Sequence, residues 1–443
     1  MSSQFQLLKQ PRFRPFFLTQ MFGPLNVNAF KTAFITLLTF RAGTMTTLDP
    51  RMLATMLPAV FVLPFFLFSA TCGQLADRHD RARLALFSKR FEFTIALIAS
   101  AGFLLSNFWL LVAALFLSGA QTTQFAPVKY AYLPQHLEEH ELTGGNGLVE
   151  ASTFVCILAG QIAGAWLAST GNAGLIALTL LALSGAGWLS ARNIPASPPP
   201  DPDLRVSWNP AVATAAILRV ARDDRNLWWL LLAIAWFWFY GATMLAQFPV
   251  YTKGVLGGSE QVYILLLCVF SVGVGVGSLV CEKLSRGRIE AGLVTVGALA
   301  MALPGFDLYL ATPAAALIHD GNAAGFLQHG AHWRMLLDIA LIGAGGGLYV
   351  VPLYALMQAR CAARHTARVI SASNILNAGL MFLSSLISLA LLRAGLDIPQ
   401  IFLALALATL VVGAMLVRRM PAFGVRFLAL MRGRAQHRLD KAQ

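Results

Sequence analysis

The amino-acid sequence predicts an all-α membrane protein whose twelve transmembrane helices form two six-helix bundles. The chain has 443 residues, of which 57% are hydrophobic and only 12% are charged, whereas charged residues make up about 25% of a typical soluble chain. Most of the sequence divides into apolar spans, and a span of about 20 residues is long enough to cross ~30 Å of hydrocarbon. A proline-rich stretch separates the first six spans from the last six.

The predicted spans fall into two groups on either side of that stretch. The first group forms an N-terminal bundle at 1–191, with spans at about 16–40, 52–76, 90–107, 109–130, 147–169 and 174–191. The second group forms a C-terminal bundle at 227–418, with spans at about 227–250, 260–281, 289–312, 333–357, 369–392 and 397–418. Residues 192–226 contain the proline run PASPPPDPD and predict a semi-rigid cytoplasmic linker, and a basic cytoplasmic tail follows at 419–443.

Lysine and arginine are concentrated in the terminal segments and in every second loop. The loop between the second and third spans, for example, is assigned Arg78, Arg81, Arg83, Lys89 and Arg90. Because loops rich in lysine and arginine stay in the cytoplasm, this pattern predicts a multi-pass protein with both termini cytoplasmic. The net charge of +13 is then a topology signal, and we expect no nucleic-acid partner.

The sequence contains no pattern typical of catalysis. Its five cysteines form no CxxC pair, which argues against a zinc site or a disulfide framework. No nucleophile and base stand in a recognisable motif, and no spacing is typical of metal ligands. We therefore expect a protein that is not an enzyme and that uses neither a metal nor a cofactor.

A faint internal repeat relates the two halves of the chain. Pro127 and Asn146 flank the turn between the fourth and fifth spans, and Pro352 and Asn374 flank the turn between the tenth and eleventh. In both halves a proline lies near the cytoplasmic end of one span and an asparagine opens the next. Parallel six-helix repeats are typical of major facilitator transporters, so we expect the major facilitator fold.

The repeat also helps to interpret Lys129, which lies two residues after Pro127. The residue two positions after Pro352 is Tyr354, which is uncharged. A residue needed only to build the turn would appear in both halves. A charge placed near the membrane centre costs roughly 2.5–3.5 kcal/mol on insertion scales, and we therefore interpret Lys129 as a substrate-binding or gating residue.

The loop GQLADRHDRAR after the second span resembles the major facilitator signature G-x-L-A-D-R-x-G-R-[RK]. In this motif we expect Gly73 to let two helices approach closely and Asp77 to accept hydrogen bonds from the N-terminus of a neighbouring helix. Arg78 and Arg81 are expected to pair with acids and to act in gating. Asp80 stands where the signature has glycine. The alternative is a basic loop that only sets topology.

Polar residues inside two apolar spans are further candidates for a substrate site. Asn28 and Lys31 lie on one face of the first span, and such a stripe must face the bundle interior or a wet cavity. Glu150 opens a second stripe in the fifth span, and its expected partner is Lys129 or Lys31. Packing alone would also explain an ion pair of Lys31 with an acid.

Two features of the C-terminal half are open to more than one interpretation. Asn374 and Asn377 share a face of the eleventh span, where they either bind a polar head group or hydrogen-bond between helices. The aromatic run Trp236–Tyr240 covers every face of one turn, and one or two of its rings are candidates to line an acyl-chain path or to stack on an ammonium group.

Several stretches together resemble one family of transporters. FAPVKYAYLPQHLEEHELTGGNGLVEAST resembles the GPxKYGxLPxHL…GGNALVExxT stretch of the bacterial lysophospholipid transporter family in the major facilitator superfamily. The resemblance continues in NVNAFKTAF, in WFWFYGATMLAQFPVYTKGVLGG, in SLVCEKLSRGRIEAGLV and in YVVPLYALMQ…ARVISASNILNA. It is strongest to the form of this module that is often fused to an acyltransferase and an acyl-carrier-protein synthetase.

The resemblance implies a flippase of the bacterial inner membrane. Its substrate would be a lysophospholipid, chiefly lysophosphatidylethanolamine, moved from the outer to the inner leaflet for re-acylation by a separate acyltransferase or acyl-carrier-protein synthetase. Lys129 matches the family's pathway lysine, and Asn26, Asn28 and Lys31 match its N-D-N-x-F-K pattern, with Val27 in place of the aspartate. We expect a monomer surrounded by membrane lipids.

Two other functions remain open from the sequence. The first is a proton-coupled major facilitator exporter of an amphiphilic small molecule, in which Glu150 or Asp338 would carry the proton. The second is a protein that does not transport but recruits an acyltransferase through its basic tail.

Overall fold

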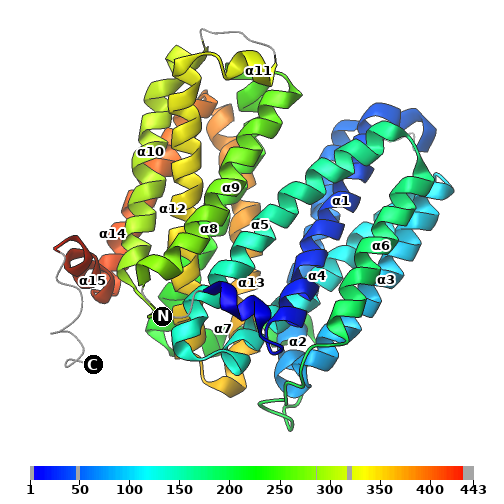
Figure 1. Ribbon diagram of the computed structural model, residues 1–443, viewed down its shortest axis with the longest axis vertical. Coiled ribbons are helices and arrows are strands. Elements are labelled where there is room, and N and C mark those ends of the chain that lie inside the picture. The colour runs from blue at the N-terminus through cyan, green and yellow to red at the C-terminus, as the bar shows by residue number, and fades with distance from the viewer. Residues whose placement is uncertain (1–3, 46–49, 286, 317–321, 433–443) are drawn as a thin grey trace.

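The computed structural model describes residues 4–45, 50–285, 287–316 and 322–432, and every regular element within them is a helix. Twelve long helices form two six-helix bundles (Figure 1). The first bundle contains α1 (Arg14–Met45), α2 (Pro50–Arg78), α3 (Arg81–Leu104), α4 (Phe108–His136), α5 (Glu139–Thr170) and α6 (Ala173–Ala191). The second contains α8 (Arg225–Val250), α9 (Glu260–Ser285), α10 (Gly292–Ala316), α12 (Gly330–Arg360), α13 (Thr366–Arg393) and α14 (Ile398–Arg419).

Ten of these helices are both long enough and apolar enough to cross a membrane, counted over the described residues. The other two, α1 and α3, have 32 and 24 residues, which is ample length at about 1.5 Å per residue. They fall short in hydropathy because α1 carries Gln20, Asn26, Asn28 and Lys31 and α3 carries several charged residues. The buried polar and charged side chains of α1 and α3 are therefore the first candidates for a functional or structural role inside the bundle.

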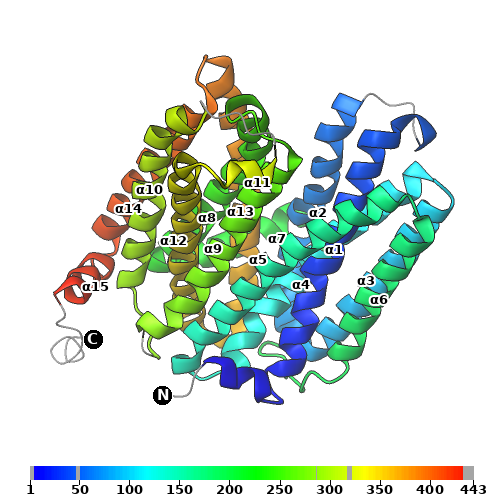
Figure 2. The same ribbon diagram turned by 45° about the horizontal axis from the view of Figure 1, so that its top comes forward.

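Short helices complete the described chain. They are η1 (Gln4–Lys9), α7 (Pro210–Asp223), η2 (Tyr251–Val255), α11 (Ala323–Phe326), η3 (Ala363–His365) and α15 (Ala422–Met431). The first and last described helices, η1 and α15, lie at one end of the molecule (Figures 1 and 2). The two ends of the described chain, called the termini below, therefore lie on the same side of the bundles, which agrees with an even number of crossings.

The expected linker is more ordered than a proline run alone suggests. After PASPPPDPD the chain forms α7, whose buried residues Ala213, Ile217 and Ala221 recur every four positions, as in an amphipathic helix. The helix packs on α2 and α13, which belong to different bundles. Upstream of α7, Ser207 donates its N–H to Gln74 Oε1 at 2.7 Å. The linker therefore packs against both bundles and is not a flexible connection.

The two bundles contact one another at the end of the molecule where η1 lies and diverge toward the other end (Figures 1 and 2). The contact pairs α5 with α9 and α2 with α13. A Cβ atom at Gly147 would lie 2.6 Å from the carbonyl oxygen of Ser278, and one at Gly73 would lie 2.9 Å from that of Ala367. Glycine at both positions lets helices of different bundles approach backbone to backbone.

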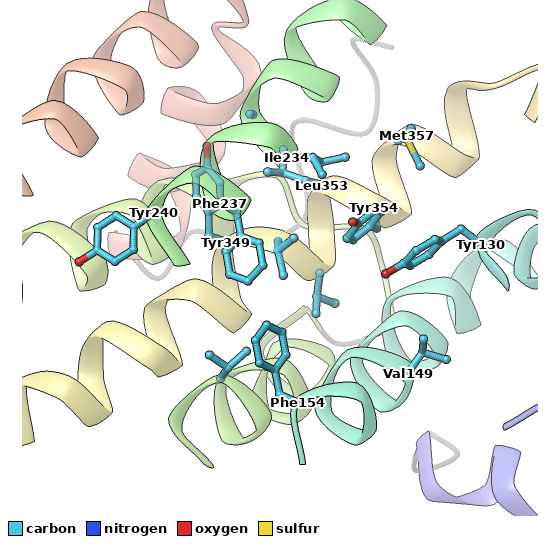
Figure 3. Packing of buried hydrophobic residues seen from close by; sticks show 14 of the residues in the cluster. Tyr130, Val149, Phe154, Ile234, Phe237, Tyr240, Tyr349, Leu353, Tyr354 and Met357 are labelled. Atoms are coloured by element: carbon cyan, nitrogen blue, oxygen red, sulfur yellow. The ribbon is translucent and has the colours of Figure 1, made fainter. Parts of the chain in front are cut away.

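One hydrophobic core crosses the boundary between the bundles. It includes Tyr130 and Phe154 of the first bundle together with Phe237 and Tyr354 of the second. Figure 3 shows Tyr130 and Tyr354 facing one another from α4 and α12. A second core, which includes Phe30, Phe103 and Phe108, lies entirely within the first bundle. The inner part of the first bundle is therefore packed against its neighbour, whereas its far part is packed on itself.

Candidate functional site

Lys129 lies in α4 where that helix packs on α5 and α1. Its side chain is buried, and its Nζ donates to Thr153 Oγ1 at 2.9 Å. The Thr153 hydroxyl also lies 3.3 Å from Gln20 Oε1 of α1. The lysine ammonium is 4.9 Å from the centroid of the Tyr130 ring, a distance suited to a cation–π contact. The ammonium is thus held by neutral groups and has no carboxylate within ion-pair distance among the described residues.

Glu150 lies on the neighbouring helix and is 0% exposed. The Tyr130 hydroxyl donates to its Oε1 at 2.5 Å, and its Oε2 has no hydrogen-bond partner among the described residues. The expected ion pair of Glu150 with Lys129 or Lys31 is not formed; the partner is Tyr130. Sequence reasoning missed this tyrosine because only charged residues, Lys129 and Lys31, were considered as partners of Glu150.

A stack of aromatic rings joins this pair of charges to the second bundle. The rings of Tyr130 and Tyr354 are parallel within 8° and their centroids are 4.4 Å apart. Trp238 donates its Nε1–H to the Tyr354 hydroxyl at 3.1 Å. Tyr354 is the repeat counterpart of Lys129, and Trp238 belongs to the aromatic run of α8. Next to Lys129 and Glu150, the two bundles therefore contact one another through neutral aromatic side chains that carry polar groups.

A carboxamide pair closes the boundary on the side toward the termini. Asn146 Nδ2 donates to Gln358 Oε1 at 2.6 Å, and Gln358 Nε2 donates to the Tyr130 carbonyl oxygen at 3.0 Å. Asn146 and Gln358 are both buried. Since these bonds join α5 and α4 to α12, they must break if the bundles separate at this end.

The two asparagines of α13 have free hydrogen-bonding capacity. Asn377 is buried next to the Tyr354 hydroxyl, and its Oδ1 has no partner among the described residues. Asn374 is half-buried, and its Nδ2 likewise lacks a partner there. An unpaired buried amide costs about 1–3 kcal/mol, so these groups are poised for a polar ligand or for water.

The three polar residues expected to act together in α1 point to different neighbours. Lys31 places its Nζ 4.3 Å from the centroid of the Phe61 ring in α2. Asn28 donates to the Pro24 carbonyl oxygen of its own helix at 2.8 Å. Asn26 donates to Glu92 Oε1 at 3.3 Å inside the first bundle. The α1 residue that does reach the Lys129 cluster is Gln20, through Thr153.

Asn26 belongs to a second buried set of charges that the sequence did not indicate. Lys89 Nζ lies 2.6 Å from Glu92 Oε2, and both side chains are nearly inaccessible. Gln121 donates to Glu92 Oε2 at 3.3 Å and to Ser88 Oγ at 2.9 Å. A cavity of ≈ 10 Å³ beside Asn26 and Glu92 is about large enough for one water molecule.

This second set corrects the assignment of Lys89 to a loop. The third helix begins at Arg81, about nine residues before the predicted span, so Lys89 lies well inside α3. The available signal was the spacing of Lys89 and Glu92, which are three apart and so face the same side of a helix. The other basic residues assigned to that loop also lie in helices, Arg78 at the end of α2 and Arg81, Arg83 and Arg90 in α3.

The signature loop after α2 forms a dense ionic contact between the bundles. Asp77 is fully buried and accepts the backbone N–H groups of Ala367 and Arg368 at 3.1 and 3.2 Å, at the N-terminus of α13. Its carboxylate lies 3.0 Å from Arg81 and 3.0 Å from the Arg368 guanidinium. Arg368 also pairs with Asp201 of the linker at 2.7 Å.

Two residues of this loop differ from expectation. Arg78 is exposed and forms no ion pair among the described residues; the arginine that pairs across the bundles is Arg368. Asp80, where the signature has glycine, caps α3 by accepting the N–H of Arg83 at 2.9 Å, and it accepts the N–H of Ser197 in the linker at 3.0 Å. The departure from the signature thus fixes the linker to the loop.

The fold and this site define a membrane transporter of two bundles with buried charges at their contact. The sequence pattern of the Major Facilitator Superfamily matches residues 16–385. The chain belongs to the Major Facilitator Superfamily.

Known proteins similar to this chain agree with that assignment. "Lysophospholipid transporter LplT" of Enterobacter sp. (strain 638) is 29% identical over 354 residues, which cover 78% of this chain and 81% of the relative. The protein of the same name from Pectobacterium carotovorum subsp. carotovorum (strain PC1) is 27% identical over 308 residues, or 68% of each chain. The crystal structure of the human organic anion transporter MFSD10 (TETRAN) is similar in fold, with a TM-score of 0.67, 13% identity and coverage of 95% of this chain and 100% of that one.

Proposed function

We propose that this protein is a lysophospholipid transporter whose substrate head group binds between Lys129 and Glu150. The observation that carries this proposal is a pair of buried, opposite charges on adjacent helices that are each held by neutral partners and not by one another. A zwitterionic head group offers a phosphate and an ammonium with the complementary arrangement. The names of the relatives favour a lysophospholipid over other zwitterions.

In this proposal each charge has a separate task. The Lys129 ammonium exchanges the Thr153 hydroxyl for a phosphate oxygen, since the phosphate brings the counter-charge that a hydroxyl lacks. Glu150 receives the ammonium of the head group at Oε2, which has no partner among the described residues. The rings of Tyr130 and Tyr354 offer aromatic faces beside the same ammonium.

The arrangement of the bundles supports entry from the side opposite the termini. With the termini in the cytoplasm, as the basic loops favour, the bundles are closed toward the cytoplasm and diverge toward the outside. Rocking of the bundles would then expose the head-group site to the inner leaflet. The contacts that must break are those of Asp77 with α13 and of Asn146 with Gln358.

The remaining parts of the proposal follow from this scheme. The units that move are the N-terminal bundle at 1–191 and the C-terminal bundle at 227–418, joined by the cytoplasmic linker at 192–226 and followed by a basic tail at 419–443. The protein acts as a monomer in a bacterial inner membrane and catalyses no covalent step. A separate acyltransferase or acyl-carrier-protein synthetase re-acylates the lipid that arrives in the inner leaflet.

Uptake of labelled lysophosphatidylethanolamine by spheroplasts tests the head-group site. Lys129→Ala and Glu150→Ala should each reduce the initial rate by about tenfold or more, the equivalent of losing roughly 1.4 kcal/mol or more of substrate interaction. Lys253→Ala is the matched control, because that lysine is exposed in η2 away from the boundary. Wild-type rates in both site variants, at equal protein levels, would remove these residues from the mechanism.

A second candidate function is proton-coupled export of an amphiphilic compound. It is favoured by two buried carboxylate oxygens without hydrogen-bond partners among the described residues, Glu150 Oε2 and Asp338 Oδ2. Collapse of transport on adding an uncoupler, together with indifference to lysophospholipid, would support it. Transport of lysophospholipid that survives the uncoupler would exclude it.

A further inference from the structure

A pocket lined by three arginines lies away from the site described above. Its walls are formed by Arg225 and Asn226 at the start of α8, by Arg418 and Arg419 at the end of α14, and by Pro421 before α15, and its volume is ≈ 410 Å³. All three arginine side chains are exposed. The helix α15, which follows the pocket residue Pro421, lies at the same end of the molecule as η1 (Figure 1).

The positive charge of this pocket is not neutralised by ion pairs with carboxylates in the part of the chain that the structure describes. None of the three arginines forms an ion pair with a carboxylate among the described residues. The acid nearest in sequence is Asp224, and its Oδ1 is engaged as the cap of α8, where it accepts the N–H groups of Asn226 and Leu227 at 2.8 and 3.1 Å. Three unpaired guanidinium groups around one pocket form a site for an anion.

Tryptophans place this pocket at the depth of lipid head groups. The Arg419 guanidinium lies 5.4 Å from the centroid of the Trp229 ring, and the Arg222 guanidinium lies 4.7 Å from that of Trp228. Both tryptophans are half-buried near the start of α8. Tryptophan is enriched where transmembrane helices meet the membrane interface, so the arginines face the head-group layer and not the hydrocarbon.

The short helix α15 supports the same placement. It packs on α10 through the buried Phe423, and its Arg426 lies 3.9 Å from Glu290. Its other face leaves Val425, Leu428 and Met431 exposed at 49%, 50% and 71%. An amphipathic helix of this kind lies in the plane of the interface with its apolar face among acyl chains. The pocket at the start of α15 therefore opens where phospholipid head groups and their acyl chains meet.

We propose that this pocket binds the phosphate of an anionic phospholipid as a resident lipid of the C-terminal bundle. Guanidinium groups bind phosphate oxygens in a bidentate manner, and basic pockets between transmembrane helices are a recurring site for anionic head groups. The lipid would join α8 to α14 through its phosphate while its acyl chains lie beside the apolar face of α15. This site is separate from the proposed head-group site at Lys129 and does not depend on it.

Native mass spectrometry of the delipidated full chain tests this proposal. The probes are dioleoylphosphatidylglycerol, dioleoylphosphatidylcholine and inorganic phosphate. Wild-type protein should prefer the phosphatidylglycerol by about tenfold or more, and each of Arg225→Gln and Arg418→Gln should weaken its binding by about fivefold. The triple variant R225Q/R418Q/R419Q should lose the preference for phosphatidylglycerol.

Arg222→Gln is the matched control, because it removes a neighbouring exposed arginine that does not line the pocket. It should keep the affinity of the wild type. Equal affinity of wild type and the pocket variants for phosphatidylglycerol would overturn the proposal, and it is the result expected if the pocket docks a soluble acyltransferase instead. Displacement of the lipid by inorganic phosphate at a similar concentration would also overturn it, because the ligand would then be a free anion.

Discussion

Two of the buried sets of charged residues in the first bundle differ in how each charge is compensated. In one, Lys89 and Glu92 form a direct ion pair at 2.6 Å on a single helix. In the other, Lys129 and Glu150 lie on adjacent helices, and each is held by a neutral hydroxyl group. The first set lies within one bundle, whereas the second lies where the two bundles meet through Tyr130 and Tyr354.

Under the proposed function, this difference would separate a structural role from a ligand-binding role. A buried ion pair with further hydrogen bonds, such as those from Asn26 and Gln121 to Glu92, has little capacity left for a ligand. A buried charge without an ionic partner keeps its desolvation cost until a counter-charge arrives. The two sets thus predict opposite outcomes when one member is removed: loss of stability at Glu92 and loss of transport at Glu150.

Removing one partner of the satisfied pair should have the largest effect. Glu92→Gln would leave the Lys89 ammonium buried without a counter-charge, at a cost of about 3–5 kcal/mol. We expect low yield and a markedly lower melting temperature of the purified protein. The double variant K89M/E92Q should recover part of the loss. A stable Glu92→Gln protein that fails to transport would contradict the structural role and place this set in the mechanism.

The second largest effect is expected at Asp77. Its carboxylate is paired, as in the Lys89–Glu92 set, but one of its partners, Arg368, belongs to the other bundle. Asp77→Asn removes the negative charge shared by Arg81 and Arg368 and weakens the cap of α13. We expect the bundles to separate at the terminus-bearing end, with transport reduced by about tenfold. Spin labels on α2 and α13 would measure the separation by electron paramagnetic resonance. An unchanged distance distribution would show that pairing across the boundary is not what holds the bundles closed.

Much of the architecture was predictable because it depends on hydropathy and local chemistry. Apolar spans of membrane length fixed the positions of the long helices, and the signature loop indicated how Asp77 meets the N-terminus of a neighbouring helix. Both depend on short stretches of sequence. The predicted start of α3 was wrong because Arg81, Arg83, Lys89 and Arg90 resemble a loop to any hydropathy measure. In the structure Lys89 is buried as the partner of Glu92 one turn further along α3, and Arg81 is buried against Ala131 of α4.

The partners within the candidate site were the part that sequence could not provide. Lys129 and Glu150 were identified from their charge in apolar spans, but the packing of α4 on α5 decides that Tyr130 is the group beside Glu150. The three α1 candidates looked alike in a one-dimensional pattern, whereas one helical turn directs Asn26, Asn28 and Lys31 to three different neighbours. The neighbour that each side chain contacts depends on how the helices pack in three dimensions, which a sequence pattern does not contain.

A smaller effect is expected at Tyr130, the neutral partner of Glu150. Tyr130→Phe keeps the ring that stacks on Tyr354 but removes the hydroxyl that donates to Glu150. Leaving a buried acceptor unpaired costs about 1–3 kcal/mol, and we expect a modest loss of stability with uptake reduced by roughly two- to tenfold. Lysophosphatidylethanolamine should raise the melting temperature of this variant more than that of wild type, because the ligand ammonium replaces the lost donor. An equal rise in both proteins would argue that Glu150 does not meet the head group.

The smallest effect is expected at Arg78, which tests whether the signature loop acts through pairing or through charge alone. Arg78 is exposed and unpaired among the described residues, whereas Arg368 carries the contact with Asp77. Exposed charges away from specific contacts usually change stability by less than about 0.5 kcal/mol. Arg78→Gln should therefore leave uptake and melting temperature near wild type, while Arg368→Gln at equal expression should lower uptake. A larger loss of uptake in Arg78→Gln than in Arg368→Gln would contradict this prediction. It would mean that Arg78 forms an ion pair only after the bundles move, in another state of the transport cycle.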